Sequence, residues 1–302
     1  MDKKILVFIG VSIISAFAAR AEDPANDLTG TLAKVRETGS IVLGYRKASF
    51  PFSYVNSRFQ PEGYTKDLCD KIMDDLKARL EMSGLKVDYL MVTPQNHLSM
   101  LKEGVIDMEC GTTGNSVARN YDVSFSVNYF VSDIRMLSRY DSNINTLDDL
   151  NEQTVVTTVG SLTHDFFAKN LDITQRKINV YYGYDHNESL LMLKTGYAVA
   201  FFLDDVVLEG LIKTSRDPNA YKISDISFGK KYYVILFRKG DEMMKKFVDK
   251  SLSDLMTSGQ VEAIYNKWFM KYLPSTGVEF NRPMRHDMWK IFLRPTDAIP
   301  NN

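Results

Sequence analysis

The chain has 302 residues, of which 44% are hydrophobic, and a formal net charge of −1. A chain of this length can bury a large core and, by the usual size of domains, divides into about two. The near-neutral charge and the lack of a Lys/Arg run exclude a nucleic-acid surface, so we expect no nucleic-acid partner. The four histidines lack metal-ligand spacing, and we expect neither a metal nor a cofactor.

The N-terminus has the three parts of a secretory signal peptide. Two lysines precede an apolar run over residues 5–19, and a small-x-small sequence follows at residues 19–21. We therefore predict a signal peptide over residues 1–21 and an exported mature chain that begins at Glu22. The alternative is an uncleaved anchor, but the run is shorter than the roughly 20 residues of a spanning helix.

Strands and helices then alternate. The run SIVLGYR (40–46) predicts a buried strand, and residues 65–80 predict an amphipathic helix with an apolar residue at every fourth position. The following segments predict strand, helix and strand in turn, and they are KVDYLMVT (86–93), NHLSMLKEG (96–104) and VIDME (105–109).

A second unit repeats this rhythm. Its predicted strands are QTVVTTV (153–159), KINVYYGY (177–184) and YAVAFFLDD (197–205). Helices are predicted at 161–171, 187–196 and 206–217, and two more, split near Ser258-Gly259, within 241–273.

This alternation predicts an α/β protein with two lobes, each a sheet flanked by helices. Two long strand-like runs, IRMLSRY (134–140) and KKYYVILFRK (230–239), are the expected crossings between the lobes and form a two-strand hinge. We expect the first lobe to span 22–136 plus 235–302 and the second to span 137–234.

The two cysteines, Cys69 and Cys110, leave two interpretations open. An exported protein can join them in a disulfide. They can equally be two small buried apolar residues.

The expected ligand position is the cleft between the lobes, because ligands of open α/β sheets lie beyond the carboxyl ends of the strands. The stretch CGTTGNSVARN (110–120) follows one such end. Gly114 allows close backbone approach, Thr112 offers a hydroxyl and Arg119 offers a planar fork for a carboxylate. The alternative for this stretch is a capped turn with a surface arginine.

Asp204 ends the apolar run AVAFFL, where an unpaired carboxylate is rare. It could hold a ligand ammonium, or it could cap the next helix. Arg46 and His186 end other strands and could meet a ligand side chain, although His186 could also start a helix. His97 follows a further strand end and gives a weaker signal.

The motifs GYRKASFPFSY, QNHLSMLKEGVIDMECGTT, VARN, YDHNESL and AVAFFLDDVVL resemble those of the family 3 extracellular solute-binding proteins, and most closely those of periplasmic glutamate/aspartate-binding proteins. The resemblance covers roughly residues 32–293. It implies the two-lobe fold of periplasmic binding proteins (type II), which closes around one amino acid.

The resemblance also implies roles for single residues. Arg119, helped by Thr112, would hold the α-carboxylate, and Asp204 would hold the α-ammonium. Arg46 and His186 would face the acidic side chain.

The chain departs from the family pattern at four positions. His97 replaces a side-chain arginine, Pro94 replaces a serine, and Gly114 and Leu162 each replace a threonine. A neutral histidine is a weaker partner for a carboxylate than arginine, so the ligand could also be another polar amino acid.

The expected function is non-enzymatic capture of an amino acid, most simply by a monomer, and delivery to the permease of an inner-membrane ABC transporter. An enzyme on the same fold, such as a dehydratase, is the alternative. It would need an acid or base in the cleft, and the candidates His97, His186 and Asp205 form no evident pair. A sensory binding protein is a third possibility.

Overall fold

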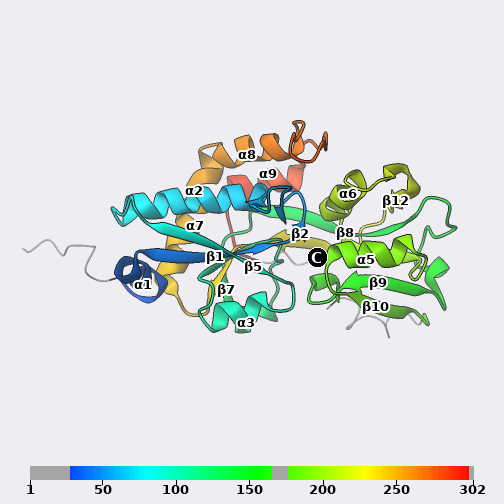
Figure 1. Ribbon diagram of the computed structural model, residues 1–302, viewed down its shortest axis with the longest axis horizontal. Helices are drawn as coiled ribbons and strands as arrows, with labels where there is room; N and C mark the ends of the chain where they lie inside the picture. The colour runs from blue at the N-terminus through cyan, green and yellow to red at the C-terminus, as the bar shows by residue number, and fades with distance from the viewer. Residues whose placement is uncertain (1–27, 165–175, 299–302) are drawn as a thin grey trace, which may run out of the picture.

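The computed structural model of the protein describes residues 28–164 and 176–298, and its strands form two main sheets that lie side by side along the long axis (Figure 1). The signal peptide predicted over residues 1–21 lies outside the described residues, as does most of the helix predicted at 161–171. Each sheet is flanked by helices, so the predicted two-lobe α/β architecture is confirmed.

The first sheet has the strand order β5-β1-β6-β14-β7. Strands β5, β1 and β6 are parallel, and β14 is antiparallel to both β6 and β7. Since parallel strands are covered on both faces, β1 consists mostly of apolar residues, as the sequence predicted. The strand bounds are β1 Ser40–Arg46, β5 Lys86–Val92, β6 Met108–Cys110, β7 Val123–Phe125 and β14 Leu236–Arg238.

Helices cover this sheet on both sides. Figure 1 shows α2 on one side and α3 on the other. The predicted amphipathic pattern of α2 is confirmed, because Leu68, Ile72 and Leu76 are all fully buried. The helix bounds are α1 Gly30–Thr38, α2 Tyr64–Arg79, α3 His97–Lys102, α7 Glu242–Thr257 and α8 Gln260–Phe269. A small three-stranded sheet follows β1, with strands β2 Ala48–Ser49, β3 Ser53–Val55 and β4 Pro61–Glu62.

The second sheet has the order β10-β9-β11-β8-β12, and β13 also pairs with β8. Strand β8 is antiparallel to β11, β12 and β13. The strand bounds are β8 Phe130–Arg139, β9 Thr154–Thr158, β10 Asn179–Gly183, β11 Ala200–Asp204, β12 Tyr221–Ile223 and β13 Lys230–Tyr233. Two helices pack on the second sheet, namely α5 His186–Lys194 and α6 Asp205–Lys213. The described 3₁₀ turns of both lobes are η1 Arg119–Tyr121, η2 Asp148–Leu150 and η3 Pro218–Ala220.

Two chain segments join the lobes and lie next to each other. Residues 126–129 connect β7 to β8, and residues 234–235 connect β13 to β14. The Ser126 amide donates to the Ile235 carbonyl at 2.9 Å, and the Ile235 amide donates to Ser126 Oγ at 2.9 Å. The two connections therefore form one paired hinge.

One predicted crossing was wrong. Residues 134–140 belong almost entirely to β8, which pairs with strands of the second sheet from Phe130 onward. A long β-type run cannot reveal from its sequence which sheet it joins. The lobe limits 22–136 plus 235–302 and 137–234 stay a prediction, and the strand pairing favours moving the first junction upstream of Phe130.

The C-terminal segment contacts both lobes beside the hinge. It contains a helix, α9 (His286–Leu293). Arg285 Nη1 donates to Asp133 Oδ2 of β8 at 2.6 Å. The Thr296 carbonyl accepts from the Asn128 amide, within the first connection, at 2.9 Å. Figure 1 shows α9 at the edge of the first lobe, near the place where the two lobes meet.

Cys69 of α2 and Cys110 of β6 form a disulfide with their Cα atoms 6.4 Å apart. This separation lies in the usual range for disulfides, and the first of the two interpretations of these cysteines is confirmed. The bond fixes α2 to the strand that leads into the predicted carboxylate-binding stretch.

Candidate ligand-binding site

A small cavity of about 20 Å³ lies where the two lobes meet. A neighbouring hollow of about 150 Å³ shares Arg46, Ser49, Pro94 and His186 with it. The cavity is lined by residues of both lobes, most of them at or after strand ends, namely Arg46, Ser49, Pro94, Thr112, Thr113, Arg119, Gly160, Ser161, His186 and Lys231.

Arg46 is the last residue of β1 and is only 6% exposed. Its Nε donates to Glu109 Oε1 at 2.9 Å, and its Nη2 donates to Thr113 Oγ1 at 3.1 Å. Its Nη1 is buried and has no hydrogen-bond partner in the described part of the chain. Burying such a donor is costly, so Arg46 is suited to a carboxylate oxygen of a ligand.

Arg119 and Thr112 line the same cavity from the stretch after β6. Thr112 Oγ1 lies 3.5 Å from Ser49 Oγ, which brings two hydroxyls together. Arg119 Nη2 donates to the Gly160 carbonyl of the second lobe at 2.8 Å. The Arg119 side chain therefore lies across the cleft and contacts both lobes in this closed arrangement.

Asp204 has a neighbour that the sequence analysis did not identify. Asp204 Oδ2 accepts from Lys231 Nζ at 2.7 Å and from the Tyr233 hydroxyl at 2.8 Å. Asp204 is 1% exposed and Lys231 is 5% exposed. Lys231 lines the cavity. Asp204 is not among the lining residues and contacts Lys231 instead.

Both predicted histidines are buried, and burial is the main cause of their altered titration. The pKa of His186 is lowered to about 3 by burial and then by Lys231 and Arg46. Burial also lowers the pKa of His97 well below its ordinary value, and Arg46, Arg119 and Lys231 lower it further. Both imidazoles are neutral at neutral pH, so they can hydrogen-bond a ligand but cannot neutralise its charge.

Two departures from the family pattern lie next to each other. A Cβ atom added at Gly114 would lie 2.3 Å from Leu162 Cδ1 and 2.8 Å from the Lys231 side chain. Leu162 is larger than the threonine of the family pattern, and Gly114, which has no side chain, leaves the space that Leu162 occupies. Gly114 also leaves room for the methylene groups of Lys231.

The structure brings together four of the predicted ligand-binding residues, since Arg46, Thr112, Arg119 and His186 all line the cavity. The other four are not among the lining residues and lie in a second layer: His97, Gly114, Leu162 and Asp204. Sequence reasoning did not identify Ser49 or Lys231. A signal for Lys231 exists, because side chains alternate along a strand and Lys231 therefore lies on the same face of β13 as Tyr233.

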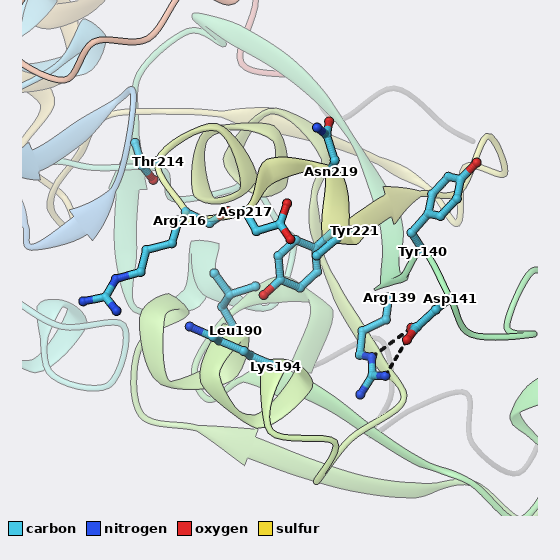
Figure 2. A pocket seen from close by; sticks show the side chains of 12 residues that line it. Arg139, Tyr140, Asp141, Leu190, Lys194, Thr214, Arg216, Asp217, Asn219 and Tyr221 are labelled. Carbon is cyan, nitrogen blue, oxygen red and sulfur yellow. Dashed lines mark hydrogen bonds and ion pairs between the residues drawn. The ribbon is translucent and has the colours of Figure 1, made fainter.

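A larger hollow of about 680 Å³ lies in the second lobe alone, beside α5, α6 and β12 (Figure 2). Its charged side chains, such as the Arg139–Asp141 pair and Lys194, are exposed. Without a buried charged group it does not resemble a specific ligand site. The interlobe cavity is the better candidate despite its smaller volume.

Gly160 gives a test of lobe closure. Its φ is +74°, and an added Cβ would lie 2.5 Å from the Pro94 carbonyl oxygen of the first lobe. We expect Gly160→Ala to weaken ligand binding at least about tenfold, because the lobes can no longer approach fully. Isothermal titration calorimetry measures this effect.

Gly259→Ala is the matched control for Gly160→Ala. Gly259 has a similar φ of +79°, but an added Cβ would meet nothing within 4 Å. We expect it to lower thermal stability through backbone strain and to leave affinity unchanged. Equal affinities of the two variants would contradict the closure argument.

The two lobes, the paired hinge and the interlobe cavity define a solute-binding protein. The sequence model of the bacterial extracellular solute-binding proteins, family 3, matches residues 41–271, and the chain belongs to this family. In the described ranges 28–164 and 176–298, no helix has the length and apolar character needed to cross a membrane.

Two relatives match almost over their whole length. The chain is 38% identical to the L-glutamate/L-aspartate-binding protein of Pseudomonas aeruginosa over 291 residues, covering 96% of each chain. It is 31% identical to the glutamate/aspartate import solute-binding protein of Escherichia coli, covering 95% of each. The fold also matches a histidine-bound ABC uptake transporter substrate-binding protein of Streptococcus pneumoniae, with a TM-score of 0.71 and 20% identity, over 82% of this chain and 98% of that one.

Proposed function

We propose that this protein captures an amino acid, glutamate or aspartate or a related polar amino acid, between its two lobes. The closed form then delivers the solute to the permease of an inner-membrane ABC transporter. In this proposal the protein acts in the periplasm as a monomer and catalyses no reaction. The names of the two relatives support the solute class, since both relatives bind glutamate and aspartate.

The observation that carries the proposal is the buried Arg46 at the interlobe cavity. Its Nη1 is a charged donor without a partner in the described part of the chain, and Arg119 lines the same cavity. Two guanidinium groups at one small cavity suit a solute with two carboxylates. Burial is the main cause of the lowered pKa values of His97 and His186, and Arg46 and Lys231 lower both further. The cations gathered at the cavity favour an anionic solute.

A thermal-shift screen of residues 22–302 against the twenty amino acids tests the proposal. A ligand at about one hundred times its Kd stabilises the fold by about 2.7 kcal/mol. We expect glutamate, aspartate or another polar amino acid to raise the melting temperature. No shift with any of them would contradict the proposal.

Arg119→Ala tests the site. We expect a loss of affinity of roughly a hundredfold, because a hydrogen-bonded ion pair to a carboxylate contributes about 1.5–3 kcal/mol. Arg119 is a better choice than Arg46, whose removal would leave the buried Glu109 without its ion-pair partner. Arg58→Ala, at an exposed arginine, is the matched control and should bind as the parent does. Unchanged affinity of Arg119→Ala would show that the site lies elsewhere.

A further inference from the structure

The two carboxylate oxygens of Asp204 differ in what they contact. Asp204 Oδ2 accepts from Lys231 Nζ at 2.7 Å and from the Tyr233 hydroxyl at 2.8 Å. Asp204 Oδ1 is buried and has no hydrogen-bond partner in the described part of the chain. The Asp204 side chain makes no capping hydrogen bond to α6, the helix that begins at the next residue. Because a buried acceptor without a donor is costly, Oδ1 is suited to the α-ammonium of an amino acid.

Lys231 is held at the other oxygen of this carboxylate. It is 5% exposed, and a Cβ added at Gly114 would lie 2.8 Å from both its Cγ and its Cε. Its Nζ lies 5.0 Å from the centre of the Tyr233 ring. Moving Lys231 away would break a buried ion pair. We therefore expect Lys231 to remain at Oδ2 when a ligand ammonium binds Oδ1, so that one carboxylate faces two positive charges.

The positive charge of Lys231 also acts on the part of the cavity expected to hold the ligand side chain. Lys231 lines the cavity together with Arg46 and His186, the two residues expected to face that side chain. After burial, Lys231 is the largest cause of the lowered pKa of His186, ahead of Arg46. Arg46 is itself paired with the buried Glu109, and His97 is neutral at neutral pH. A negative side chain in this part of the cavity is therefore attracted by the Lys231 ammonium, whereas a neutral amide is not.

We propose that Lys231 is a specificity-determining residue that makes the cleft prefer acidic amino acids over their amides, that is, glutamate over glutamine and aspartate over asparagine. The inference rests on the proposed function and deepens it, because it selects among the polar amino acids. Asp204 Oδ1 receives the α-ammonium, and Lys231 stays at Oδ2. The positive charge that remains in excess at this carboxylate favours a ligand whose side chain is negative.

Isothermal titration calorimetry of residues 22–302 with L-glutamate, L-glutamine, L-aspartate and L-asparagine tests the inference. We expect each acid to bind about tenfold to hundredfold more tightly than its amide, because a buried unit charge acts strongly on a nearby ion. Equal or tighter binding of the amides would overturn this inference and leave capture of an amino acid standing. Binding of some other amino acid, but of none of these four, would do the same. Binding of no amino acid at all would overturn both.

Variants at Lys231 separate its role from a merely structural one. Glutamate and glutamine share their α-carboxylate and α-ammonium, so the ratio of their affinities reports the side chain. Lys231→Gln can still donate to Asp204 but lacks the charge, and it should lower the preference for glutamate about tenfold. Lys231→Arg should keep the parent's ratio, and Lys194→Gln, at an exposed lysine, is the matched control for loss of a charge.

A merely structural lysine would change both affinities alike. An unchanged ratio in Lys231→Gln would therefore overturn the inference. If Lys231→Gln fails to fold, the parent's two ratios of acid to amide decide.

Discussion

Replacing Asp204 with alanine is expected to lower the free energy of unfolding by about 3–5 kcal/mol. The variant would leave the ammonium of Lys231 buried without its carboxylate, and the Tyr233 hydroxyl would lose the same acceptor. Both groups are almost fully buried, so water cannot readily replace the lost contacts. Urea unfolding followed by circular dichroism measures the change.

Two further variants control for this effect. Asp225→Ala removes a fully exposed carboxylate 3.9 Å from Arg135 and should leave stability nearly unchanged. The double variant Asp204→Leu with Lys231→Met removes both buried charges and should be much more stable than Asp204→Ala. If Asp204→Ala were as stable as Asp225→Ala, the ion pair would not be a buried one in solution.

The second large effect concerns acidic pH. The pKa of His186 falls from 6.5 in the unfolded chain to about 3 in the fold, chiefly through burial. Between these values the unfolded state binds the proton and the folded state does not, so stability is full above pH 6.5 and falls as the pH approaches 3. At pH 4 we expect His186 alone to cost about 3 kcal/mol relative to pH 7.

His186→Gln tests this contribution, since glutamine can still hydrogen-bond Thr158 but does not titrate. Its unfolding free energy should fall less between pH 7 and pH 4 than that of the parent. His97 adds to the parent's dependence in the same direction. His286→Gln, at an exposed histidine, should follow the parent's profile. Identical profiles for both variants would indicate that His186 is accessible to protons in the folded state.

Much of the site could be predicted from sequence, because polar residues at the carboxyl ends of apolar strands converge in such folds. Arg46 is the last residue of β1, and His186 comes shortly after β10. The stretch after β6 supplied Arg119 and Thr112 through its glycine- and threonine-rich composition. These are local signals, and they do not depend on knowing which strands are neighbours.

The missed features depend on tertiary contacts. The Asp204–Lys231 pair joins the end of β11 to β13, and each of these strands pairs with β8. Lys231 lies near the start of the run predicted to cross between the lobes, and the sequence does not show that its side chain points inward. Gly114 and Leu162 were each identified as departures, but only the fold shows that they touch. The wrong placement of one crossing has the same origin, because sheet membership is not a local property.

The C-terminal segment has a practical consequence for handling the protein. Its Thr296 carbonyl and its Arg285 side chain bind the connection after β7 and strand β8, respectively. An affinity tag fused to the C-terminus would therefore come a few residues after chain that is bonded beside the hinge of the two lobes. A tag placed ahead of Leu28, before the first described helix, keeps that region as the native chain has it.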